Sequence, residues 1–121
     1  MHITSKAQIR PLVSPKGETV FELIGRVAEH GGAAQHSLAH IVIAPGGAST
    51  RHFHKVSEET YYLLRGVAAM MIDGRKFELH PGETCLIQPG ETHQVSNPGP
   101  DDLEFLAVCA PAWAPGDSFE A

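Results

Sequence analysis

Five Pro-Gly pairs divide this chain of 121 residues into short segments; they begin at Pro45, Pro81, Pro89, Pro98 and Pro115. Proline presets φ for a turn, and glycine accepts the positive φ that several turn types require, so each pair marks a turn or chain reversal. No long window carries apolar residues at helical spacing without a glycine or proline to interrupt it. The sequence therefore predicts an all-β fold.

Short apolar or alternating stretches fill most of the space between these turns, and each is predicted to be a strand. They are residues 20–24, 37–43, 50–54, 59–64, 68–72, 76–79, 84–87, 93–96 and 103–109. Asp73-Gly74 lies between two of them and is a strong signal for a two-residue hairpin. A chain of this length is expected to form one domain, residues 1–121, with a core of its own.

Four side chains have the chemistry to hold a divalent metal ion. His52 and His54 are two residues apart, so on a strand they point to the same face, about 6 to 7 Å apart along the backbone. Glu59 opens the next predicted strand, and a turn brings it back toward the histidine pair. His93 follows the turn at 88–91 and would join a second hairpin to the first. We expect one ion per chain, and manganese, iron, nickel, zinc, cobalt and copper all suit these ligands.

The arrangement resembles the cupin superfamily, because both cupin motifs occur in order across residues 38–110. The first motif is filled by Gly46, His52, His54, Glu59 and Gly66, and the second by Gly82, Gly90, His93 and Asn97. Gln88 stands where the second motif has its first proline, but Pro89-Gly90 still suits the turn. The inward-facing ligands, the strand number and this resemblance all imply a jelly-roll β-barrel, also called a double-stranded β-helix. The barrel is expected at about 36–110, with an N-terminal arm at 1–35 and a Pro-rich tail at 111–121.

Several assignments around these ligands have alternatives. Glu58 is a rival to Glu59, because the first motif tolerates either spacing, although the six residues before Gly66 favour Glu59. A second alternative is a cupin that has kept these residues without stable metal occupancy. His36 and His40 are open candidates for the pocket. The other histidines, namely His2, His30 and His80, are expected to be surface or satisfied polar residues.

Strand parity predicts which other side chains face the barrel interior. If Glu59 faces inward, Tyr61 and Leu63 do too, whereas Tyr62 and Leu64 face the other side. Tyr61 is the candidate catalytic residue, as an acid, base or hydrogen-bond donor, and its alternative role is a barrel-lining aromatic. The predicted apolar wall residues are Met70, Phe105 and Ala107. Cys85 and Cys109 lie in apolar strands and are expected to be free, buried thiols.

Composition excludes some partners. A net charge of −5, a pI near 5.8 and the lack of a clustered basic face argue against nucleic acid. No apolar run is long enough for a membrane span, and residues 1–10 lack the apolar core of a signal peptide, so a cytoplasmic protein is expected. The N-terminal arm is expected to pack across a partner subunit in a homodimer. The tail is expected to be extended, with Trp113 against the barrel or at an interface.

The sequence predicts the class of function to which this protein belongs. Three neutral imidazoles and one carboxylate leave a divalent ion with net positive charge and open positions for water or substrate. We therefore expect a metal-dependent enzyme that acts on a small oxygenated organic molecule, either as a dioxygenase or as an isomerase or lyase at a carbonyl or enolate. The alternative is a non-enzymatic metal and small-molecule binding module or sensor. No lysine and arginine cluster marks a phosphosugar site.

Overall fold

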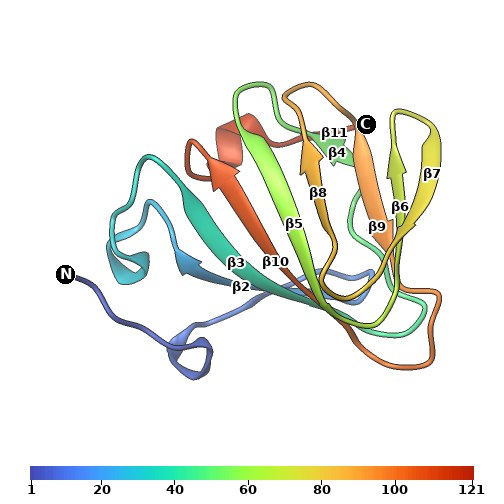
Figure 1. The fold of residues 1–121 in the computed structure, drawn as a ribbon. Helices are drawn as coiled ribbons and strands as arrows, with labels where there is room; N and C mark the ends of the chain where they lie inside the picture. Colours follow the sequence, from blue (N-terminus) through green and yellow to red (C-terminus); the bar gives the residue numbers. More distant parts are fainter.

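The computed structural model describes residues 1–121 as two antiparallel β-sheets that face each other (Figure 1). The larger sheet contains, in spatial order, β1 (Leu12–Val13), β2 (Glu18–Ile24), β3 (Ser37–Ile43), β10 (Leu103–Ala110), β5 (Glu58–Arg65) and β8 (Thr84–Ile87). The smaller sheet contains β11 (Phe119–Glu120), β4 (His52–Phe53), β9 (His93–Ser96), β6 (Ala68–Ile72) and β7 (Arg75–Leu79). The all-β, jelly-roll prediction is confirmed.

Helical structure is limited to three short 3-10 turns: η1 (Lys6–Gln8), η2 (Ala28–His30) and η3 (Pro115–Asp117). Each is three residues long. None of them has the length or the apolar character that crossing a bilayer would demand. The frequent prolines and glycines explain this shortage, because both residue types destabilise a helix interior.

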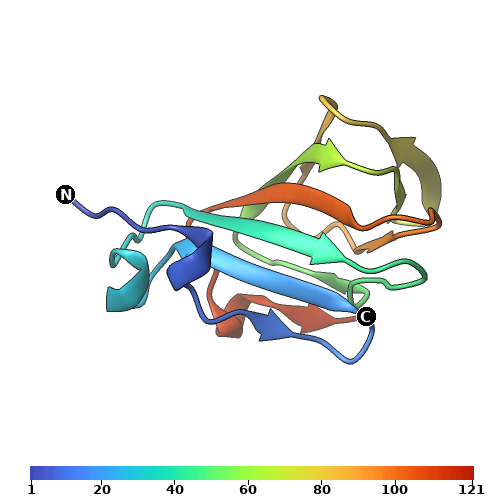
Figure 2. The same ribbon diagram turned by 90° about the horizontal axis from the view of Figure 1, so that it is seen from below.

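All nine predicted strands have a counterpart; the main differences are a shorter β4 and two strands that were not predicted, β1 and β11. The strand predicted at 50–54 is reduced to His52–Phe53. The tail was predicted to be extended, but it forms η3 and then β11, which pairs antiparallel with β4. In the N-terminal region, β2 pairs along β3 and extends the larger sheet (Figure 2). Whether residues 1–35 also contact a partner subunit stays a prediction.

The hydrophobic core lies between the two sheets. It comprises 13 buried residues: Ile41, Ile43, Tyr61, Leu63, Ala68, Met70, Ile72, Leu79, Ile87, Val95, Leu103, Phe105 and Ala107. Both sheets contribute, since each presents alternate side chains to the interior. Burying one large apolar side chain stabilises the fold by about 1.5 to 3 kcal/mol. The predicted wall residues Met70, Phe105 and Ala107 are all part of this core.

The predicted hairpin turn at Asp73-Gly74 joins β6 to β7 and is hydrogen-bonded to the segment before His93. Asp73 and Gly74 have φ of 47° and 80°, as a type I′ turn requires. The Asp73 side chain accepts a hydrogen bond from the Thr92 backbone N–H at 2.9 Å. The Thr92 carbonyl in turn accepts from the Asp73 N–H at 2.8 Å. This reciprocal pair fixes the chain one residue before a candidate ligand.

Candidate metal centre and pocket

The four predicted ligands come together at one end of the interior. His52 lies on β4, directly opposite His93 on β9, and the two ring centroids are 4.3 Å apart. His54 follows the end of β4, and Glu59 lies near the start of β5. One ligand atom from each residue lies within 4.8 Å of all the others. His54, Glu59 and His93 are buried, and His52 is half-buried.

The three imidazoles are oriented by the backbone. In each ring Nδ1 faces a carbonyl oxygen, which only accepts, so Nδ1 carries the proton. The Nδ1 atoms of His52, His54 and His93 lie 2.7, 2.9 and 2.9 Å from the backbone oxygens of Thr50, Asp117 and Glu91, respectively. In the neutral rings Nε2 is therefore an unprotonated ligand atom. Such partners are typical of metal-binding histidines, because they fix both tautomer and ring direction.

The donor atoms fit a cation. Nε2 of His54 is buried, has no hydrogen-bond partner and lies 3.5 Å from Oε1 of Glu59. Nε2 of His93 lies 3.2 Å from the same oxygen. A carboxylate oxygen and an unprotonated imidazole nitrogen are both acceptors, so a positive ion or a proton is needed among them. This cluster can hold a metal ion, and its N and O donors suit the divalent first-row metals. Glu58 is exposed and lies outside the cluster.

Without a metal ion, the pKa values of these side chains reflect how close together they lie. Burial opposes charge on Glu59, but the adjacent imidazoles of His54 and His93 outweigh burial and hold the Glu59 pKa below its usual range. Burial also lowers the pKa of His52, helped by the neighbouring His93. For His54, burial is outweighed by the Glu59 carboxylate, so its pKa is raised. A proton can therefore bind to these ligand atoms, and a divalent ion would compete with it.

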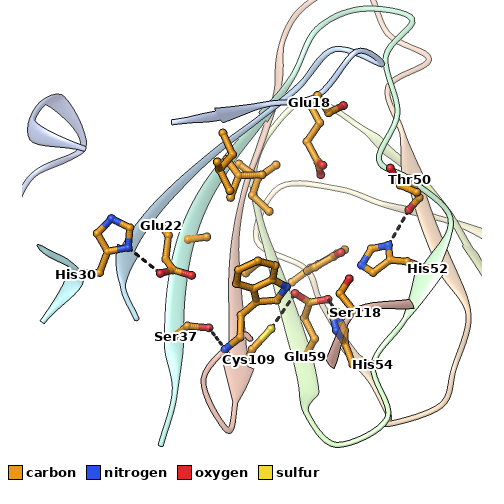
Figure 3. Close-up of a pocket in the computed structure, with 18 of the residues that line it drawn as sticks. Glu18, Glu22, His30, Ser37, Thr50, His52, His54, Glu59, Cys109 and Ser118 are labelled. Carbon is orange, nitrogen blue, oxygen red and sulfur yellow. Dashed lines mark hydrogen bonds and ion pairs between the residues drawn. The ribbon is translucent and has the colours of Figure 1, made fainter. Parts of the chain in front are cut away.

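A pocket of about 510 Å³ opens beside this cluster, and Figure 3 shows most of its lining. His52, His54 and Glu59 lie at one side of it, whereas Glu22 and His30 lie at the other (Figure 3). Apolar side chains supply much of the wall, among them Val20, Ile41, Ala107 and Trp113. A cavity of this size suits a small organic molecule.

Tyr61 faces the pocket, as strand parity predicts. It is 4 % exposed and lies among the pocket-lining residues, whereas Tyr62 is 45 % exposed on the opposite face. Its ring packs at 4.7 Å from that of Phe105 and 6.2 Å from that of His93. Burial, and then the charge on Glu59, raise the pKa of Tyr61 well above its usual value, so its phenol is neutral and can donate. Its catalytic role stays a prediction.

Neither His36 nor His40 faces the pocket. On β3, Ser37, Ala39 and Ile41 line the pocket, so His40 points to the other side of the sheet, where its Nε2 lies 2.9 Å from Glu104. His36 is exposed just before β3. The strand register, which decides the direction of the His40 side chain, could not be predicted from the sequence.

Two other predictions concern loop residues. Asn97 donates to the backbone oxygens of Ile43 and Asp101 at 2.9 and 2.8 Å and accepts from the Gly99 N–H at 3.0 Å, so it satisfies backbone groups as predicted. The Trp113 N–H donates to the Ser37 hydroxyl at 2.9 Å. Because Trp113 also lines the pocket, it packs against the barrel, which was one of its two predicted roles.

Sequence reasoning missed several pocket residues. The Cys109 thiol, predicted to be only a buried hydrophobe, donates to Oε2 of Glu59 at 3.1 Å. The two residues are directly opposite each other on β10 and β5, a pairing that appears only in the folded sheet. Glu18 and Glu22 both line the pocket. Their spacing with Val20 on one strand was the available signal, since residues at i, i+2 and i+4 share a face.

The comparisons with known proteins agree with this architecture. A family model described as a cupin domain matches residues 39–109. An uncharacterised protein of Methanocaldococcus jannaschii is 31% identical over 115 residues, covering 95% of this chain and 90% of that protein. An oxalate-binding protein of Thermotoga maritima is 34% identical over 94 residues, covering 77% of this chain and 76% of that protein. The chain belongs to the cupin family.

A solved structure supports the fold. A polyketide cyclase from Streptomyces resistomycificus superposes with a TM-score of 0.81, covering 100% of this chain and 85% of that chain. The two sequences are 24% identical, so this likeness concerns the fold. The resemblance predicted from the two motifs is confirmed.

Proposed function

We propose that this cupin is a divalent-metal-dependent enzyme that acts on a small oxygenated organic molecule, either as a dioxygenase or as an isomerase or lyase at a carbonyl or enolate. The observation that carries the proposal is the buried Nε2 of His54, which has no partner and belongs to a four-residue donor set beside the pocket. His52, His54, Glu59 and His93 would hold one ion. When bound, such an ion polarises a carbonyl or enolate oxygen or, if redox active, binds dioxygen.

The chain's own residues supply the remaining requirements. The apolar wall excludes water from a bound molecule and thereby strengthens polar contacts inside the pocket. Tyr61 keeps its proton and can donate a hydrogen bond to an oxygen of the substrate. Glu59 stays ionised as a ligand, with its second oxygen bonded to Cys109.

Metal analysis with oxygen uptake tests this function. Untagged protein, expressed without metal supplements, is analysed by plasma mass spectrometry, and the same sample is assayed with enediol, diketone and thiol substrates. Near-stoichiometric iron, copper, nickel or manganese with oxygen consumption supports a dioxygenase. Zinc, or another metal without oxygen uptake, directs the assays to isomerases and lyases. Protein that neither contains nor binds a divalent metal contradicts the proposal.

A non-enzymatic binding module is the second candidate, and the relative described as an oxalate-binding protein favours it. In that case the metal and pocket would hold a ligand without converting it. Calorimetric titration of oxalate into manganese-loaded protein, followed by recovery of unchanged oxalate, tests this candidate. Tight binding without turnover of any substrate supports the module, whereas turnover supports the enzyme.

We also propose that the chain forms a homodimer. Four large hydrophobic side chains, namely Tyr62, Leu64, Leu86 and Val108, are 45, 41, 50 and 36 % exposed, and all belong to the larger sheet. They lie on its outer face, because the alternate residues of β5 and β10 are in the core. A second copy would cover this surface. A cytoplasmic location stays a prediction.

Light scattering tests the dimer. Wild-type protein should have twice the 13.0 kDa mass of the chain. Leu86→Glu should shift it to the monomer, because a carboxylate in an apolar interface is desolvated without a partner. Phe77→Glu is the matched control, since Phe77 is 38 % exposed on the other sheet. A monomeric wild type, or a dimer that both variants leave unchanged, contradicts the proposed interface.

A further inference from the structure

One carboxyl group in the pocket has no partner. Glu18 lies at the start of β2, and its side chain extends into the pocket, apart from the candidate metal ligands (Figure 3). The side chain is half-buried and makes no hydrogen bond and no ion pair. Burial, and then the charge on Glu59, raise the pKa of Glu18 to about 7. A polar group held in this way is available to a bound molecule.

The neighbouring carboxyl on the same strand face is already paired. Oε1 of Glu22 lies 2.7 Å from Nδ1 of His30, and their side chains are 18 and 20 % exposed. The Glu22 carboxylate is therefore already bonded to His30, whereas the Glu18 carboxyl has no partner. The contrast between these two residues identifies Glu18 as the free polar group on the β2 wall.

The charge of the whole lining restricts what can bind. Of the 22 lining residues, four are glutamates and one is an arginine, Arg10, which is exposed; none is a lysine. A bound divalent ion would offset Glu59 and attract an anionic group placed directly on it. Arg10 is the one side chain of fixed positive charge in the lining, and solvent screens its charge because it is exposed, whereas ionised Glu18 would repel a second negative charge at a distance from the ion.

We propose that the pocket selects molecules whose metal-distal part is uncharged and carries a hydroxyl or carbonyl group for Glu18. This inference rests on the proposed metal-dependent function and names the class of ligand for that site. Protonated Glu18 donates to such a group, and ionised Glu18 accepts from a hydroxyl. The apolar wall around Val20, Ile41 and Trp113 covers the rest of the molecule. Molecules with a carboxylate or phosphate at a distance from the metal, phosphosugars among them, are the excluded class.

Two probes that differ by one carboxylate test the proposal. Catechol and 3,4-dihydroxybenzoate present the same diol to a metal, and only the second carries a distal negative charge. Zinc-loaded protein at pH 8 is titrated with each by calorimetry, and zinc avoids oxygen chemistry on the probes. The fluorescence of Trp113, the only tryptophan in the chain, reports whether binding occurs in the pocket.

Glu18→Gln and Glu58→Gln form the matched pair of variants. Both remove one negative charge, but Glu58 is exposed and outside the pocket. Wild-type protein should bind catechol at least about tenfold more tightly than 3,4-dihydroxybenzoate. Glu18→Gln should reduce this ratio severalfold, whereas Glu58→Gln should preserve it. Because the Glu18 side chain makes no hydrogen bond and its ionised form is opposed by burial, Glu18→Gln should not lower the thermal unfolding temperature of the zinc-loaded protein.

The outcomes separate this inference from the proposed function. Equal or tighter binding of 3,4-dihydroxybenzoate, or a ratio that Glu18→Gln leaves unchanged, overturns the ligand class. So does a zinc-loaded wild type that binds neither probe. Failure of the wild type to retain zinc overturns the proposed function itself, and metal analysis of the titrated sample shows which of the two has failed.

Discussion

The backbone carbonyl of Asp117 accepts a hydrogen bond from Nδ1 of His54 at 2.9 Å, although the two residues are 63 positions apart. The Asp117 carboxylate also accepts from the backbone N–H groups of Lys55, Val56 and Ser57, at 2.9, 3.0 and 3.0 Å. Burial opposes this charge, but the three N–H donors outweigh it and lower the pKa of Asp117. The tail therefore holds both the tautomer of a candidate ligand and the loop that follows it.

Asp117→Ala should loosen this loop. Three N–H groups lose their acceptor, so we expect a loss of about 1 to 2 kcal/mol in unfolding free energy and roughly tenfold weaker metal binding. Urea unfolding and competition with a chelator measure the two effects. Asp102→Ala is the control, because Asp102 is exposed and its side chain makes no hydrogen bond. Equal metal affinity in both variants would show that the tail does not support the site.

Replacing His52 and His54 together by Ala should abolish tight metal binding. Metal that binds only the folded state raises unfolding free energy by about 3 kcal/mol at a hundredfold excess over the dissociation constant, and the variant should lose this gain. Thermal unfolding with and without added metal, with metal analysis, provides the measurement. The exposed pair His36 and His80, both replaced by Ala, serves as control. Unchanged metal content in the His52 and His54 variant would refute the ligand assignment.

Tyr61→Phe should alter turnover while metal content stays at the wild-type level. The substitution removes only the hydroxyl group, and the ring contact with Phe105 at 4.7 Å remains. If the phenol donates a proton or hydrogen bond in the reaction, kcat should fall by about a hundredfold. Steady-state kinetics on whichever substrate the metal assays identify gives the answer. Equal activity would leave Tyr61 as a wall residue.

Cys109→Ala should weaken metal binding more than Cys109→Ser. The thiol donates to Oε2 of Glu59, and burial followed by the charge on Glu59 raises the pKa of the thiol, so it keeps its proton. Serine retains a donor, whereas alanine leaves a buried carboxylate oxygen without one, at a cost of about 1 to 3 kcal/mol. Competition titrations with a fluorescent zinc chelator rank the three proteins. The same affinity for both variants would limit Cys109 to packing.

The pH dependence of stability should carry a contribution from Glu18. Its pKa of about 7 in the folded state lies above the ordinary 4.5, so the native state binds more protons between these values. Stability from this group is complete below pH 4.5 and is lost as pH rises toward 7, by at most about 3 kcal/mol. Urea unfolding of chelator-treated wild type and Glu18→Gln across this range measures the difference. Parallel curves for the two proteins would contradict the raised pKa.

Much of the architecture could be predicted from local features of the sequence. Turn signals such as Asp73-Gly74 depend on backbone conformations that few residues adopt, so they are visible without tertiary information. Strand parity likewise placed Tyr61 inward and Tyr62 outward, because alternation is a property of any strand. The spacing of His52, His54, Glu59 and His93 predicted a cluster that the fold brings within 4.8 Å.

What the sequence by itself determined is therefore the strand pattern, the family and the four converging donors, since all three follow from short-range rules and motif spacing. Tertiary structure alone decided that His40 points away from the pocket, that Cys109 lies opposite Glu59, and that the tail returns to hold His54. These depend on strand register and on contacts between residues far apart in the chain. No local propensity encodes such pairings, because they arise only when the sheets pack.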